Sequence, residues 1–159
     1  MMTQPIPPVK KSVRVNAPQA RAFDVFTRDF DRWWPRAHHI GASPMKQAVL
    51  EPKNGGRWYE RGEDGSECEW GRVQIWEPPQ RVLLIWQIAG DWKYDSRFET
   101  EVEVRFIAEG PATTLVELEH RNLDRFGVKA DEVRGMFDSP GGWNGALALY
   151  AAIVAAPSA

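Results

Sequence analysis

The sequence has 159 residues, about the size of one domain, and its charges of both signs are interspersed with a formal net charge of −2. Because no basic stripe stands out, nucleic acids and membrane surfaces are not expected as partners. Cys68 is the single cysteine, which excludes an internal disulfide and a multi-cysteine metal site and suits a reducing compartment. The first residues have neither a basic region nor an apolar core, so we expect no signal peptide and a cytoplasmic location.

The first third of the chain predicts a tail, a strand, a helix and a loop. Residues 1–8 are proline-rich and predict a disordered N-terminal tail before a single domain over 9–155, with a second tail at 156–159. The alternation of apolar and polar residues predicts a strand over residues 9–16. A helix then begins near Pro18, carries Phe23 and Phe26 at helical spacing, and ends before Pro35. Residues 36–44 lack periodicity and predict a loop.

The middle of the chain predicts short antiparallel strands separated by glycine and proline turns. Residues 98–108 show the clearest alternation, with Val102 and Val104 on one side and Glu101 and Glu103 on the other, so this strand has one wet face. About seven strands result when the segment near the N-terminus is added to 46–51, 57–61, 67–76, 81–88, 98–108 and 113–120.

The last part of the chain predicts the element around which the domain is built. Residues 122–138 form a broken helical lead-in. After Pro140, Trp143, Leu147, Tyr150 and Val154 recur at helical spacing, and alanine fills most positions between them. A helix that is apolar all round but too short for a bilayer belongs in a protein core. The prediction is an α+β domain in which a curved antiparallel sheet wraps around a long C-terminal helix.

Several short motifs occur in an order that resembles one family, the homologues of the activator of heat-shock-protein-90 ATPase, in the START-like superfamily. The motifs are Ala17-Pro18, Trp33-Trp34-Pro35, Gly55-Gly56-Arg57-Trp58, Glu77-Pro78-Pro79-Gln80-Arg81-Val82 and Gly142-Trp143-Asn144-Gly145-Ala146-Leu147. The resemblance implies a helix-grip fold with a cavity between sheet and helix, where most relatives bind hydrophobic small molecules and a few act as enzymes or co-chaperones. The terminal helix is shorter and richer in alanine than in many relatives, which implies a roomier or open-ended cavity.

Strand alternation predicts which side chains face that cavity. If Val104 and Val116 face the helix, the same parity turns inward Trp58, Glu60, Glu69, Val73, Leu84 and Trp86, and the helix adds Trp143 and Leu147. Trp58 and Trp86 are the expected aromatic walls for a planar apolar ligand, although both rings are equally compatible with simple core filling. One β-bulge would turn a whole set of these residues to the other face.

Four polar candidates accompany the aromatic ones. A carboxylate of Glu60 or Glu69 in an apolar cavity would orient a ligand or move a proton, whereas a register shift would place it in solvent. His120 ends its strand near the cavity mouth, as a ligand contact or as a structural histidine. His38 is expected at the cavity entrance, and its neighbour His39 gives no metal site because no third ligand stands at a defined spacing.

Trp33 and Trp34 close the first helix beside that entrance. We expect one of these two rings to anchor the helix end and the other to contact the cavity.

Three functions remain open. The first is binding of a hydrophobic or aromatic small molecule, favoured by eight tryptophans in one domain and by the lack of catalytic motifs. The second is an enzyme of cyclase, dehydratase or hydrolase type that uses Glu60, Glu69 or His120 as acid or base. The third is a co-chaperone that stimulates a chaperone ATPase. No cofactor or metal is expected, and exposed strand edges are compatible with a homodimer.

Overall fold

Seven antiparallel strands form one sheet in the order β1-β7-β6-β5-β4-β3-β2. The computed structural model describes residues 6–156. In chain order the elements are β1 (Val9–Val15), α1 (Gln19–Thr27), α2 (Phe30–Trp33), β2 (Met45–Leu50), β3 (Arg57–Gly62), β4 (Glu67–Glu77), β5 (Arg81–Trp86), β6 (Thr100–Gly110), β7 (Thr113–Arg121), the 3₁₀ helix η1 (Leu123–Lys129), α3 (Ala130–Asp138) and α4 (Trp143–Ala155). The helix predicted after Pro18 is therefore two helices.

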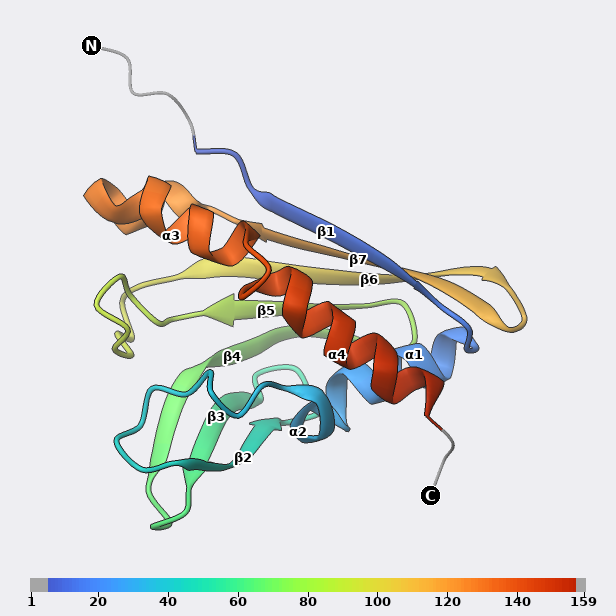
Figure 1. Cartoon of the computed structure of the whole chain (residues 1–159), viewed down its shortest axis with the longest axis horizontal. Helices are drawn as coiled ribbons and strands as arrows, with labels where there is room; N and C mark the ends of the chain where they lie inside the picture. Colours follow the sequence, from blue (N-terminus) through green and yellow to red (C-terminus); the bar gives the residue numbers. More distant parts are fainter. Residues whose placement is uncertain (1–5, 157–159) are drawn as a thin grey trace.

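The sheet curls, and α4 crosses its inner face on a diagonal (Figure 1). α1 and α2 lie near the C-terminal end of α4, while α3 covers the sheet beyond its N-terminal end. This arrangement confirms the predicted α+β helix-grip fold. The alternation predicted for the sixth strand is also confirmed, because Val102 and Val104 are buried while Glu101 and Glu103 lie on the outer face and pair with Arg121.

The C-terminal half of α4 packs directly on aromatic side chains. The Tyr150 hydroxyl donates a hydrogen bond of 2.7 Å to the carbonyl of Ala22 in α1. The Tyr150 ring lies edge-on to Phe26 and Trp33, with ring centroids 5.3 and 5.6 Å apart. These contacts hold α4 against α1 and α2 and fill the space beneath this half of the helix.

A β-bulge in β4 decides which side chains reach the inner face. In the pairing of β3 with β4, Trp58 lies opposite Gly71 and Tyr59 lies opposite Glu69, so Trp70 is the extra residue. A Cβ at Gly71 would lie 1.8 Å from the carbonyl oxygen of Ile85, so this close approach of two strands requires glycine. The bulge places Trp70, rather than Glu69, among the buried core residues.

The prediction that Glu69 faces the helix is therefore wrong. Its side chain is 33% exposed and pairs with Arg57, which also binds Glu67 at 2.9 Å. The sequence alternation was read through the bulge as if the strand were regular, and the extra residue reverses the facing of the residues that precede it.

The predicted N-terminal tail is only partly visible. Residues 1–5 and 157–159 lie outside the described part of the chain. Arg134 of α3 donates hydrogen bonds to the carbonyl groups of Pro7 and Pro8 at 2.8 and 3.1 Å, and Ile6 packs against the core. Within residues 6–156, no helix combines the length and the hydropathy needed to cross a membrane.

Candidate functional site

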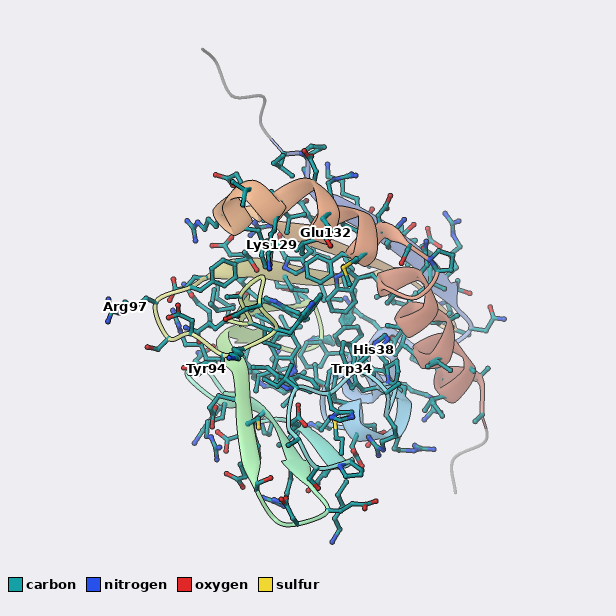
Figure 2. All side chains as sticks on the ribbon, turned by 60° about the vertical axis from the view of Figure 1, so that its left-hand side comes forward. Trp34, His38, Tyr94, Arg97, Lys129 and Glu132 are labelled. Carbon is teal, nitrogen blue, oxygen red and sulfur yellow. The ribbon has the colours of Figure 1, made fainter. Side chains whose placement is uncertain are left out.

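A cavity of about 400 Å³ lies at the N-terminal end of α4. Its walls come from the loop after α2, from β4 and β5, from the loop after β5, and from α3 and α4. Figure 2 views the molecule from this end, with Trp34 and His38 close together below α3. The lining residues are Trp34, Ala37, His38, His39, Ile40, Trp70, Trp86, Ile88, Trp92, Met136, Phe137, Ser139, Gly141, Gly142, Trp143 and Ala146. Several of them are solvent-exposed, which marks the mouth: Ala37, His38, Trp92, Met136 and Gly141.

Four buried indole rings dominate the walls, from Trp34, Trp70, Trp86 and Trp143. The ring of Trp34 lies 5.4 Å from that of Trp70 and 5.8 Å from that of Trp143. The Trp86 and Trp143 rings are 6.2 Å apart. Such edge-on and tilted contacts fix each ring against its neighbours. The four rings therefore pack against one another as a continuous aromatic wall, and a volume of about 400 Å³ remains open beside them.

The protein itself satisfies the N–H group of each of these four rings. Trp34 donates to the carbonyl of His38 at 3.0 Å, and Trp86 donates to the carbonyl of Ile88 at 3.0 Å. Trp70 and Trp143 donate to the buried side chains of Glu60 and His120. What these walls offer to a ligand is therefore the apolar ring surface and not a hydrogen-bond donor.

Glu60 ties two walls of the cavity together. Its carboxylate is 1% exposed and accepts hydrogen bonds from Trp70 Nε1 at 2.8 Å, from the Ile40 amide at 2.6 Å and from the Gly41 amide at 3.3 Å. Three N–H donors compensate a buried charge in place of a cation. Glu60 faces the inner side as predicted, but it supports the lining residues Trp70 and Ile40 from behind and does not itself line the cavity.

His120 supports Trp143 in the same way. Its Nδ1 accepts the hydrogen bond from Trp143 Nε1 at 3.2 Å, so Nε2 carries the proton and donates to Thr100 Oγ1 at 2.9 Å. The ring is fully buried and stacks on Phe137 with centroids 4.6 Å apart. Burial lowers the pKa of His120 to about 3, which keeps the imidazole neutral in its two hydrogen bonds. His120 is thus a structural histidine behind the wall.

The polar side chains of the lining, apart from the indole N–H groups, are His38 and His39 of the loop after α2 and Ser139 after α3. Partial burial lowers the pKa of His38, so its imidazole is neutral at pH 7. His39 Nδ1 lies 2.9 Å from the carbonyl oxygen of Gly41. Among the described residues, no Lys, Arg, Asp or Glu lines the cavity, and no group of three His, Cys, Asp or Glu side chains is placed to hold a metal ion.

The structure divides the predicted site residues into four groups. Trp34, His38, Trp86 and Trp143 line the cavity. Trp33 anchors the end of α2, with its indole N–H on the carbonyl of Val25 at 3.1 Å. The others, apart from Glu69 on the outer face, are buried without lining the cavity: Trp58, Glu60, Val73, Leu84, Val104, Val116, His120 and Leu147.

Several lining residues were missed from the sequence. Trp70 was missed because its neighbour Glu69 was predicted to face inward, and the signal that reveals Trp70 is Gly71, since an isolated glycine inside a strand indicates a bulge. Trp92 and Phe137 belong to a loop and to the end of α3, where alternation gives no information about facing. Their positions follow from tertiary packing, which no local pattern encodes.

Comparison with known proteins identifies the family. The sequence model of the family described as activator of Hsp90 ATPase homolog 1-like protein matches residues 16–155. The chain belongs to this family. The match begins after β1 and extends through α4, so it includes every element that lines the cavity. The comparison with curated proteins gave no match.

Solved structures that are similar to this chain share its fold. An anthrahydroquino-γ-pyrone synthase, Txn09, complexed with SUM, is 39% identical over 96% of this chain and 99% of its own, with a TM-score of 0.64. The self-sacrificing resistance protein CalC from Micromonospora echinospora is 32% identical over 94% of each chain, with a TM-score of 0.68. A protein from Rhodobacter sphaeroides, 21% identical over 96% of this chain and 95% of its own at a TM-score of 0.62, shows the fold alone.

Proposed function

We propose that this protein binds a planar, uncharged aromatic small molecule of the fused-ring polyketide class in the cavity at the N-terminal end of α4. The observation that carries the proposal is the enclosure of this cavity by the rings of Trp34, Trp70, Trp86 and Trp143. Its volume of about 400 Å³ lies within the range of small-molecule sites, roughly 300–1,000 Å³.

The chemistry of the lining favours an uncharged ligand. A charge buried among these rings would lose its hydration without gaining a partner, because the described lining residues include no ionised side chain. Flat aromatic faces gain the most from stacked and edge-on contacts with indoles. The partners for polar substituents of the ligand are the lining side chains of His38, His39 and Ser139.

The relatives support the same class of ligand. The 39% identical relative is named as an anthrahydroquino-γ-pyrone synthase, and an anthrahydroquino-γ-pyrone is a fused-ring aromatic compound. The 32% identical relative is a resistance protein. The similarity to the synthase favours a fused-ring aromatic ligand over a lipid.

Calorimetric titration with three probes tests the proposal. We expect saturable binding of quinizarin, a planar uncharged hydroxyanthraquinone. Anthraquinone disulfonate, which carries a charge at each end, and palmitate, which is flexible and anionic, are expected not to bind measurably. Binding of palmitate without binding of quinizarin would show that the site takes lipids instead.

Two substitutions on α4 locate the site. Ala146 lines the cavity and is 2% exposed, so Ala146→Phe places a ring in the ligand volume and abolishes quinizarin binding. Ala148 lies on the same helix with an exposed side chain, and Ala148→Phe is the matched control that leaves binding unchanged. Equal affinity in both variants would place the ligand elsewhere.

A second candidate function is acid–base chemistry on the bound ligand, and the observation that favours it is His38. This neutral imidazole lies at the cavity mouth, while Glu60 and His120 are already engaged in hydrogen bonds behind the walls and Glu69 faces outward. A general base must reach the proton that it removes. Product analysis of ligand incubated with the protein and with His38→Gln tests this function, which requires turnover that the variant lacks.

Stimulation of a chaperone ATPase stays a prediction. It is supported by the family description alone. A chain that binds none of the three probes but accelerates ATP hydrolysis by a heat-shock protein 90 chaperone would favour it over ligand binding.

A further inference from the structure

The loop between β5 and β6 closes as a tight hairpin with an unusual residue at its turn. The Trp92 amide donates to the carbonyl of Ala89 at 2.9 Å, and the Ala89 amide donates to the carbonyl of Lys93 at 2.9 Å. A β-bridge between Ile88 and Tyr94 flanks these bonds. This pattern is that of a three-residue hairpin loop whose last residue adopts a left-handed backbone conformation.

Trp92 occupies that left-handed position, with φ at 62°. Hairpins of this kind favour glycine there, because a Cβ clashes with the backbone in this conformation. The loop contains a glycine at Gly90, but two residues earlier. The turn therefore holds a bulky ring at the position where the backbone least tolerates one, and such local conflicts concentrate at functional sites.

The loop is fixed against the 3₁₀ helix η1, so the position of the Trp92 ring is defined. Gly90 packs on Lys129, whose Cδ would lie 3.1 Å from a Cβ at that glycine, and Lys129 Nζ lies 3.4 Å from the Gly90 carbonyl oxygen. The Lys93 amide also donates to the Asp91 carboxylate at 3.1 Å. These contacts over-determine the turn and keep the left-handed residue in place.

The Trp92 ring lies at the cavity mouth. It lines the cavity, is 41% exposed, and meets the ring of Phe137 edge-on with centroids 6.3 Å apart. Its neighbour Tyr94 has the same exposed fraction of 41% but does not line the cavity. Figure 2 shows Arg97, further along this loop, pointing away from the cavity into solvent.

We propose that Trp92 is a ligand-contact residue whose indole ring covers the outward edge of the bound aromatic molecule and completes the enclosure made by the four buried tryptophans. This inference rests on the proposed function. The half-exposed ring gains burial when the ligand is present, since the ligand supplies the surface that the empty mouth lacks. The turn keeps tryptophan in place of glycine because the ring is needed there.

Calorimetric titration of the full chain with quinizarin tests the proposal. Trp92→Gly and Trp92→Ala both remove the ring, and we expect each to raise the Kd by about tenfold or more, with Trp92→Phe between them and the unchanged protein. Tyr94→Ala is the matched control on the same loop, with a Kd that changes less than about twofold.

Thermal unfolding of the same variants distinguishes the effect of the Trp92 ring from the effect of backbone strain. Trp92→Gly is expected to unfold about 2–4 °C above Trp92→Ala, because only the residue with a Cβ is strained in the left-handed conformation. If Trp92→Gly unfolds at a higher temperature than Trp92→Ala and yet binds quinizarin more weakly than the unchanged protein, the tryptophan is kept for the ligand and not for the turn. Equal unfolding temperatures of the two variants would overturn the argument from the turn.

The outcomes of the titration are distinguishable. If the unchanged protein does not bind quinizarin, the proposed function fails and this inference fails with it. If the unchanged protein binds but Trp92→Gly binds within about twofold of it, the inference alone is overturned. Equal weakening by Tyr94→Ala would assign the effect to the loop rather than to the Trp92 ring and would also overturn it.

Discussion

His120 shows how a single buried residue controls the shape of the cavity wall. Its neutral ring accepts from Trp143 and donates to Thr100, and a proton on Nδ1 would break the first of these bonds. The ring lies among Trp86, Phe137 and Trp143, and its desolvation there disfavours the charged form. The folded state therefore disfavours a proton on the buried His120 ring, whereas unfolding exposes the ring to water, where it is protonated more readily.

The predicted consequence is a loss of stability on acidification. The unfolded state takes up a proton at His120 near the ordinary pKa of about 6.5, whereas the folded state does so only at about 3. Stability is full above pH 6.5 and falls by roughly 1 kcal/mol per pH unit as the pH drops towards 3. Urea unfolding between pH 7 and 5 measures this slope.

His120→Gln is the control for that slope. Carboxylates such as Glu67, whose pKa is lowered by its hydrogen bond to Arg57, also favour unfolding in acid, but only below about pH 4.5. The variant should therefore lose most of the slope from pH 7 to 5, whatever its absolute stability, and keep only the smaller contribution of His38, whose pKa is also lowered by burial. An unchanged slope in the variant would refute the assignment to His120.

Glu60 is the second residue whose replacement has a predictable effect on the free energy of unfolding. Glu60→Leu leaves the N–H groups of Trp70, Ile40 and Gly41 buried without an acceptor, and we expect the free energy of unfolding to fall by about 3 kcal/mol or more. Glu60→Gln keeps one acceptor oxygen and should cost about 1 kcal/mol. Urea denaturation compares the variants, and a Leu variant as stable as the Gln variant would contradict the role assigned to the carboxylate.

At the scale of elements, the bulge in β4 decides the composition of the cavity. Gly71→Ala would press a Cβ against the Ile85 carbonyl, and because both are backbone-fixed the strands must separate. We expect a loss of more than about 3 kcal/mol in the free energy of unfolding. Gly135→Ala in α3 meets no atom within 4 Å and should instead stabilise by up to about 1 kcal/mol, which makes it the matched control. Equal effects of the two changes on urea unfolding would refute this account of the bulge.

The same bulge separates what the sequence could predict from what it could not. The alternation of residues 98–108 and the apolar run after Pro140 set the sheet and the central helix, because both patterns depend on burial alone. Trp86 and Trp143 were predicted at the cavity for the same reason, whereas Trp34 and His38 were predicted there because the first helix was expected to end beside the entrance. Glu69 was predicted to face inward and Trp70 lies there instead, because one extra residue in a strand reverses the facing of its neighbours. The position of Trp92 could not be predicted, because this residue lies in a loop whose position is set by contacts with η1.

At the scale of the whole molecule, the helix-grip fold is filled at one end of α4 and hollow at the other. Tyr150, Phe26 and Trp33 close the C-terminal half, whereas Gly142 and Ala146 leave room at the N-terminal half. The two edges of the sheet are β1 and β2. The homodimer expected from exposed edges stays a prediction, and sedimentation equilibrium measures it.

The most direct measurement of the central claim is a crystal structure of the protein with quinizarin. The account predicts the fused rings in the cavity against the faces of Trp34, Trp86 and Trp143, with one edge beneath Trp92 and the oxygen substituents towards His38. A quinizarin molecule bound outside this cavity, or crystals grown at saturating quinizarin in which the cavity holds no quinizarin, would contradict it.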